Sequence, residues 1–114
     1  MSRKDKTRMS AAQHAAVSEF FAVLSEPSRL VLLQALHRGP LTVNELVAAS
    51  GLKQANVSKQ LAQLFDARLV VRERDGTSIR YAISDPMVFS LCERVCHKMA
   101  KDTQYEAAIF HRRI

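Results

Sequence analysis

The stretch that decides the fold is residues 41–64, which read LTVNELVAASGLKQANVSKQLAQL. In its first half Thr42 stands three residues before Glu45, the spacing of a capping box at the start of a helix. Gly51 ends that helix, and the apolar residues that follow recur at the helical period. Two short helices joined by a turn that contains glycine form a helix-turn-helix. The helices expected here cover about 43–49 and 54–65.

The second of these helices combines an apolar face with a polar one. No acidic residue lies between Lys53 and Phe65. A helix fits the major groove of DNA, where Gln and Asn can pair with adenine and Lys can reach guanine or phosphate. We expect the outward residues to bind DNA: Gln54, Ala55, Asn56, Ser58, Lys59, Gln60 and Gln63.

Downstream of the helix-turn-helix, two β-prone runs flank Asp75-Gly76-Thr77 and predict a hairpin with a charged tip. We expect a wing over about 68–84 that contains this hairpin. The wing holds four arginines and two acidic residues. Arginine suits the phosphate backbone or a narrow minor groove. The wing residues expected to bind DNA are Arg72, Arg74 and Arg80.

Helices are also expected on both sides of this unit. Apolar residues spaced as a helical stripe predict a first helix after Ser10, and Pro27 is well placed to begin a second. The second should reach about Arg38, before an extended link at Leu41-Thr42. Its inward residues are expected to be Leu30, Leu33 and Leu36, and a last helix should cover about 86–101. This order is that of a mainly α winged helix-turn-helix with a small β-hairpin.

The two ends of the chain carry weaker signals than this core, which spans 10–102. Residues 1–9 are polar and basic and predict a flexible arm. Residues 103–114 form a tail in which Tyr105–Phe110 could be helical or simply packed.

Composition narrows the classes of function. The chain has 114 residues, 47% hydrophobic and 25% charged, with a formal net charge of +6, which predicts one folded domain with a polyanionic partner. Its longest apolar run is the five residues 20–24, whereas a membrane helix needs about 20.

Two cysteines make no disulfide framework, so we expect a cytoplasmic protein. No catalytic constellation or glycine-rich phosphate loop is visible, which argues against an enzyme.

Three segments resemble a known family: FFAVLSEPSRLVLLQAL (Phe20–Leu36), residues 41–64, and VVRERDGTSIRYAI (Val70–Ile83). The chain is similar, over about Val17–Met99, to the arsenical-resistance-repressor (ArsR/SmtB) family of dimeric bacterial winged-helix repressors. The resemblance implies that 54–65 is the recognition helix and 72–80 the wing. It also implies a homodimer formed through the first and last helices, which represses its promoter until an effector weakens DNA binding.

The known metal sites of that family are not retained. The segment 41–46, which matches the cysteine pair of soft-metal sensors, holds no thiol. The positions that match the zinc ligands of the last helix are occupied by Asp85, Met87, Lys98 and Lys101, and a protonated lysine has no lone pair for zinc. Lys53 and Gln60 also replace the family's usual Ser and His, so the operator sequence is not implied.

Cys92 and Cys96 are the remaining candidates for effector sensing. At i, i+4 their Cβ atoms would lie about 5–6 Å apart, whereas a disulfide needs about 3.5–4.5 Å. A thiophilic metal or metalloid ion, or a disulfide between subunits, is geometrically easier. The alternative is that both thiols pack as small hydrophobes between helices. No other cofactor is expected.

Two functions remain open from the sequence. The first is a homodimeric repressor that binds an inverted-repeat operator in double-stranded DNA and responds to metal or thiol oxidation. The second is a winged-helix module without a sensing role, whose basic face docks an acidic protein.

Overall fold

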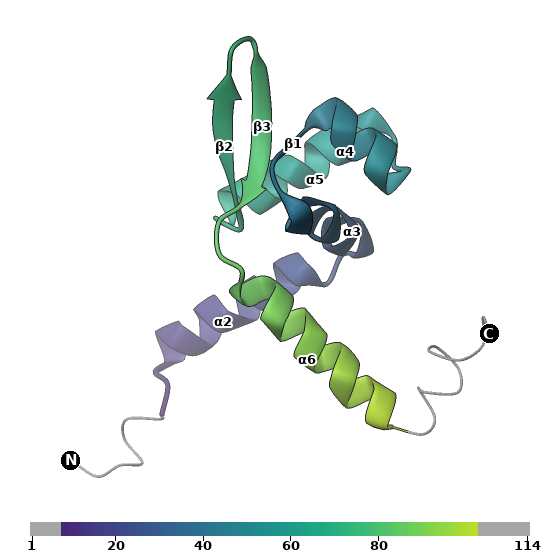
Figure 1. Ribbon diagram of the computed structural model, residues 1–114. Helices are drawn as coiled ribbons and strands as arrows, with labels where there is room; N and C mark the ends of the chain where they lie inside the picture. The colour runs from purple at the N-terminus through teal and green to yellow at the C-terminus, as the bar shows by residue number, and fades with distance from the viewer. Residues whose placement is uncertain (1–7, 103–114) are drawn as a thin grey trace. The chain divides into compact units, whose positions relative to one another are not determined.

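The computed structural model describes residues 8–102, with the elements ordered α2, α3, η1, β1, α4, α5, β2, β3 and α6 (Figure 1). The chain divides after Ser84 into two compact units, and α6 belongs to the second. Most of the expected arm (1–7) and the whole expected tail (103–114), with its Tyr105–Phe110 segment, lie outside the described residues. Arg8 and Met9 of the arm are described and exposed.

Helix α2 (Ala11–Leu24) begins at a capping box. The backbone N–H of Gln13 donates to the Ser10 hydroxyl at 3.1 Å, and the Ser10 N–H donates to the Gln13 side chain at 2.8 Å. Leu24 is the one buried residue of α2, while Val17 and Phe21 are exposed. The predicted apolar stripe is therefore present but largely uncovered in the single chain.

Helix α3 (Pro27–Ala35) continues into a short 3-10 turn, η1 (Leu36–Arg38). Pro27 occupies its first turn, and the Glu26 carboxylate accepts a hydrogen bond from the Ser28 N–H at 3.0 Å. The expectation that Leu30 points inward is wrong, because this side chain is 39% exposed. The inward positions are taken by Leu32, Leu33 and Leu36, which rotates the buried face of the helix away from Leu30.

The helix-turn-helix consists of α4 (Val43–Ser50) and α5 (Gln54–Asp66). The predicted capping box is confirmed, since the Glu45 N–H donates to Thr42 Oγ1 at 3.2 Å and the Thr42 N–H donates to Glu45 Oε1 at 2.9 Å. Gly51 closes α4 in a left-handed conformation, with φ at 75°, which glycine adopts without steric cost. Helices α3, α4 and α5 pack on one another around a core that includes Leu46, Val57, Leu61 and Leu64.

The predicted hairpin is strands β2 (Val70–Asp75) and β3 (Ser78–Ile83). Because Asp75 pairs with Ser78, the turn is Gly76-Thr77, with the φ of Gly76 at 64°. The expected extended link is strand β1 (Leu41–Thr42), which pairs antiparallel with β3 and makes a three-stranded sheet ordered β1-β3-β2. Figure 1 shows the hairpin projecting beyond α4 and α5, as a wing does.

The second unit contains helix α6 (Met87–Lys101). The Asp85 carboxylate accepts a hydrogen bond from the Met87 N–H at 2.9 Å, which satisfies one of the free donors at the start of the helix. Val95 is 49% exposed. Within residues 8–102 no helix combines the length and hydropathy needed to cross a membrane.

We predict that Thr42→Ala lowers the free energy of unfolding by about 1 kcal/mol, because it removes the side-chain cap of α4. Urea denaturation followed by circular dichroism measures this change. Thr77→Ala is the matched control, since Thr77 is an exposed turn residue. Equal effects of the two substitutions would show that the cap does not stabilise α4.

Candidate nucleic-acid interface

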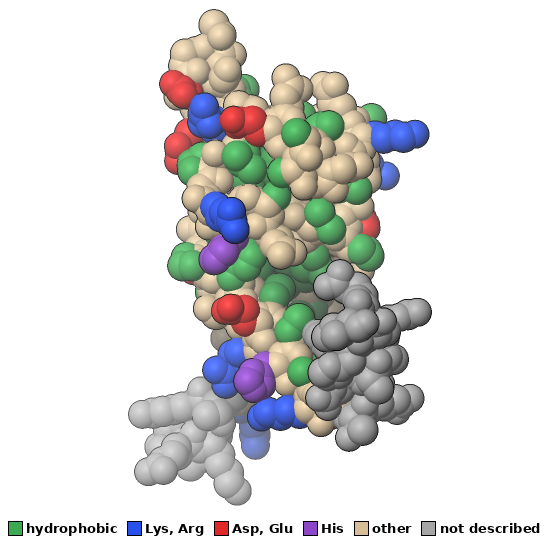
Figure 2. All heavy atoms as spheres, turned by 45° about the vertical axis from the view of Figure 1, so that its right-hand side comes forward, with side chains coloured by type: hydrophobic (Ala, Val, Ile, Leu, Met, Phe, Trp, Pro, Cys, Tyr) green, Lys and Arg blue, Asp and Glu red, His purple; other side chains and the backbone are tan. Residues whose placement is uncertain are grey.

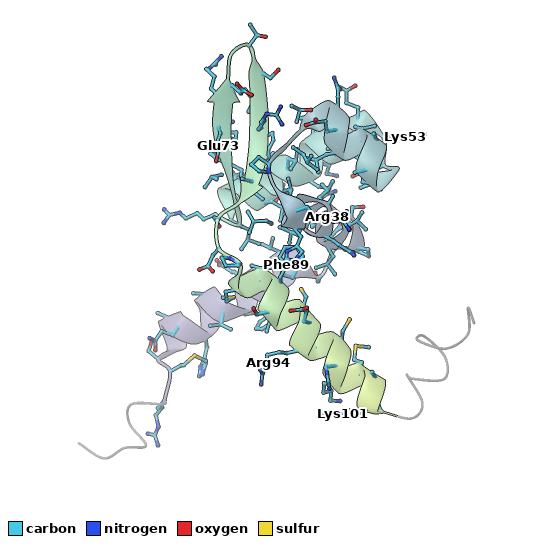
Figure 3. The ribbon with its side chains drawn as sticks, in the orientation of Figure 1. Arg38, Lys53, Glu73, Phe89, Arg94 and Lys101 are labelled. Atoms are coloured by element: carbon cyan, nitrogen blue, oxygen red, sulfur yellow. The ribbon has the colours of Figure 1, made fainter. Side chains whose placement is uncertain are left out.

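Helix α5 presents a polar arc to solvent. Its buried side holds Val57, Leu61 and Leu64, which pack against α3 and α4. No acidic side chain occurs in α5 before Asp66, so this arc repels no phosphate. Figure 3 labels Lys53, which precedes α5 at its N-terminal end. The residues that we call the exposed arc are those predicted residues that the structure leaves exposed: Gln54, Ala55, Ser58, Lys59 and Gln63.

Two of the predicted DNA-binding residues are not in this arc. Gln60 is only 5% exposed, and the expectation that it points outward is wrong. It accepts a hydrogen bond from Arg29 Nε at 2.8 Å and donates to Asn56 Oδ1 at 3.0 Å. Asn56 is half-buried and donates in turn to Ser28 Oγ at 3.4 Å. Both polar atoms of the Asn56 amide are therefore engaged within the protein.

The two faces of the wing differ in charge. Side chains alternate along a strand, so Arg72 and Arg74 share a face with their partners Tyr81 and Ile79. The Arg72 guanidinium carbon lies 3.9 Å from the centre of the Phe65 ring, a cation–π contact that orients it. Arg74 is exposed and makes no ion pair among residues 8–102.

The other face of the wing is neutralised internally. Arg80 forms ion pairs with Glu45 at 3.3 Å and with Asp75 at 3.2 Å, and Glu73 lies opposite it across the strand pair. Figure 2 shows acidic and basic side chains next to one another along the hairpin. Arg80 thus joins the wing to α4, and acidic side chains of the protein itself offset its charge.

The carboxylate of Glu45 is stabilised by the same contacts. The hydrogen bond from the Thr42 N–H is the largest cause that lowers the pKa of Glu45; desolvation opposes it, and the Thr42 hydroxyl and the charge of Arg80 lower the pKa further. A depressed carboxyl pKa means that the contribution of the ionised group to stability is present at neutral pH. It is lost only in acid, as the pH falls through the lowered pKa.

Helix α6 carries the two free thiols, Cys92 and Cys96. Cys96 is exposed and Cys92 is half-buried; burial first, and the nearby Cys96 second, raise the pKa of the Cys92 thiol. Within residues 8–102, no three His, Cys, Asp or Glu side chains of this single chain gather to hold a metal ion. The Lys98 ammonium is 2.9 Å from the Asp102 carboxylate. Two further cations of α6, Arg94 and Lys101, are labelled in Figure 3.

Sequence reasoning missed Arg29 and Ser28, which hold the buried amides of α5. One signal for Arg29 was available. A cation in the first turn of a helix opposes the helix dipole, and Arg29 is the third residue of α3. A charge in that position indicates a partner from another element.

The fold and this arc define a winged helix-turn-helix regulator, and the comparisons identify its family. The sequence model of the bacterial regulatory protein arsR family matches residues 26–71. The chain is 36% identical to the AntR antimony-specific transcriptional repressor, with a TM-score of 0.72, over 91% of this chain and 96% of that one. A homodimeric winged helix-turn-helix domain from Mycobacterium bovis, Mb0332, described as a possible ArsR-family regulator, has 25% identity and a TM-score of 0.71, over 90% and 93% of the two chains.

Among curated relatives, the probable mercury resistance operon repressor of Streptomyces lividans is 42% identical over 74 residues, which is 65% of this chain. The chain spans 59% of the length of that relative. The chain belongs to the arsR family of bacterial regulatory proteins, which are DNA-binding transcriptional regulators.

Proposed function

We propose that this chain is a homodimeric transcriptional repressor of the cytoplasm that binds an inverted-repeat operator and leaves it when an effector binds. The observation that carries the proposal is the exposed arc of α5, which is free of acidic residues and lies in the same unit as the wing face of Arg72 and Arg74. A polar arc of this kind can contact base edges in the major groove while arginines of the wing bind phosphate.

Exposed apolar side chains support the dimer. Phe21 of α2 is 49% exposed and Val95 of α6 is 49% exposed. When a second copy of the chain covers such large apolar side chains, the free energy of the assembly falls. The relative Mb0332 is a homodimer. We therefore assign α2 and α6 to the dimer interface. Two recognition helices would then enter successive major grooves about 34 Å apart.

Fluorescence anisotropy with the DNA upstream of the coding sequence tests the proposal. At about 150 mM salt, where non-specific binding is weak, we expect the upstream DNA to bind at least tenfold more tightly than a scrambled duplex, about 1.4 kcal/mol. Equal binding of the two duplexes would overturn the proposal. Retention of an acidic protein after nuclease treatment, without enriched DNA, would favour the docking module instead.

The wing provides a prediction about salt. Arg74→Ala should reduce the slope of log K against log salt by about 1.8, because each of the two subunits loses one phosphate contact and each contact contributes about 0.9. Arg80→Ala should change the slope less, because Glu45 and Asp75 already offset that charge. Titrations at several salt concentrations measure both slopes. Equal reductions would mean that the internal ion pairs of Arg80 open on DNA.

We also propose that the effector is a thiophilic metal or metalloid ion that acts on Cys92 and Cys96. Thiolates are the soft ligands that such ions prefer, and each thiol loses its proton as its bond to the ion forms. If α6 lies at the dimer interface, the two copies contribute four thiols. The two relatives named for mercury resistance and for antimony support this chemical class of effector.

The double variant Cys92→Ser/Cys96→Ser should bind the operator as the wild type does but resist release. We expect mercuric or trivalent antimony ions, added under reducing conditions, to release the wild type and leave the variant bound in an anisotropy titration. Full release of the variant by the same ion would remove these thiols from the mechanism.

A further inference from the structure

A chain of side-chain hydrogen bonds connects three helices of the first unit. Arg29 Nη1 donates to the carbonyl oxygen of Val23, in the last turn of α2, at 3.1 Å, and Arg29 Nε donates to Gln60 Oε1 of α5 at 2.8 Å. Gln60 Nε2 donates to Asn56 Oδ1 at 3.0 Å, and Asn56 Nδ2 donates to Ser28 Oγ of α3 at 3.4 Å. One arginine therefore contacts both α2 and α5.

The chemistry of Arg29 determines which group donates and which accepts in each of these hydrogen bonds. A guanidinium group donates hydrogen bonds and accepts none. Gln60 must therefore turn its oxygen toward Arg29 and its NH₂ toward Asn56, which orients the Asn56 amide in turn. Each amide has one orientation that satisfies it, and among the described residues no buried side-chain N or O atom lacks a partner.

The hydrogen bond of Arg29 to α2 holds that helix in a defined orientation, at a place where apolar packing is sparse. Leu24 is the single buried residue of α2, so few apolar contacts hold this helix to the rest of its unit. The carbonyl of Val23 is one of the last four of α2, which have no partner inside the helix. A cation is favourable at that end of a helix dipole, so the Arg29 contact with α2 is a charge-assisted hydrogen bond, which is stronger than a neutral one.

We propose that Arg29 and Gln60 are positioning residues that set the placement of α5 relative to α2, and thereby the half-site spacing that the dimer accepts. The inference rests on the proposed function, because it takes α2 as a dimer helix and α5 as the recognition helix. In such a dimer one path from one recognition helix to the other passes through the α5–Arg29–α2 link of each subunit. Half-sites lie about 10–10.5 base pairs apart on one face of DNA, so a rigid link rejects operators with altered spacing.

Two substitutions at Gln60 separate positioning from packing. Gln60→Leu keeps most of the side-chain volume but removes the acceptor for Arg29. Gln60→Glu keeps an acceptor and gains an ion pair with Arg29. The Asn56 amide can then reverse and donate to the introduced carboxylate, while the Ser28 hydroxyl, which can also donate, donates to Asn56. We therefore expect Gln60→Glu to retain the link.

The experiment measures binding to the operator and to derivatives with one base pair inserted or removed between the half-sites. We expect the wild type to prefer the native spacing by about tenfold or more, since one charged hydrogen bond in each subunit opposes the distortion. The preference should fall to about threefold or less in Gln60→Leu and persist in Gln60→Glu. Gln34→Leu, at an exposed position of α3, is the matched control and should keep the wild-type ratio.

Circular dichroism melting and sedimentation velocity check that each variant folds and dimerises. If Gln60→Leu does not fold, Arg29→Met takes its place in the spacing experiment. This variant keeps an apolar stem but loses the hydrogen bonds to Gln60 and to the Val23 carbonyl. A folded, dimeric link-breaking variant that keeps the wild-type spacing ratio would overturn the inference. A wild type that binds the operator no better than a scrambled duplex would instead overturn the proposed function.

Discussion

Leu61→Ala is expected to lower the free energy of unfolding by about 2–5 kcal/mol, through lost apolar burial and the cavity left behind. Leu61 is 1% exposed and lies on α5 opposite the exposed arc. A domain of this size has a total stability of about 5–15 kcal/mol, so this single change would remove much of it. Urea denaturation, with the slope checked for two-state behaviour, measures the effect.

Leu30→Ala is the matched control, because it makes the same chemical change at a side chain that is 39% exposed. We expect it to cost about 1 kcal/mol or less, in proportion to the smaller area buried. If the two substitutions cost the same, the pattern of burial described for α3 and α5 would be wrong.

The helix boundaries were predictable because local chemistry determines them. The Thr42 capping box begins α4, Pro27 begins α3 and Gly51 ends α4. Each signal acts within about four residues of the chain, the range of a capping hydrogen bond. The apolar period of α5 also predicted three of its four buried residues, Val57, Leu61 and Leu64, but not Gln60.

The position of Gln60 was not predictable in the same way. It stands three residues after Val57 and one before Leu61, at the flank of the buried face, where its polar type favoured an exposed position. Its partner Arg29 is 31 residues away in the sequence. A buried amide is stable only when its hydrogen bonds are made, and no local pattern supplies that partner.

Strand β1 and the role of Arg80 also depend on distant contacts. A strand of two residues has no period of its own, and Leu41-Thr42 becomes a strand because it pairs with Arg80-Tyr81. The sequence predicts that three arginines of the wing bind DNA, because it does not show which of their charges are paired within the protein. The ion pair of Arg80 with Glu45 joins residues 35 positions apart, so only the fold distinguishes Arg80 from Arg74.

Lys59→Ala is expected to weaken operator binding by about tenfold or more, since a side-chain contact to guanine or phosphate contributes about 1–3 kcal/mol. Lys59 is exposed, lies near the middle of the exposed arc, and makes no ion pair among residues 8–102. Its ammonium group therefore reaches DNA without first breaking a contact within the protein. Thermal unfolding should be unchanged, because the side chain is exposed and is not one of the buried residues of the core.

Arg38→Ala is the matched control for this prediction. Arg38 is an exposed cation of η1 (Figure 3), outside both the exposed arc and the wing, so its removal lowers the net charge by the same amount. Anisotropy titrations of both variants, on operator and scrambled DNA, separate the two effects. Lys59→Ala should lose affinity for the operator, whereas Arg38→Ala should stay within about twofold of the wild type at physiological salt, where distant charges are screened. Equal losses in the two variants would mean that net charge, and not the placement of Lys59 on α5, carries the binding.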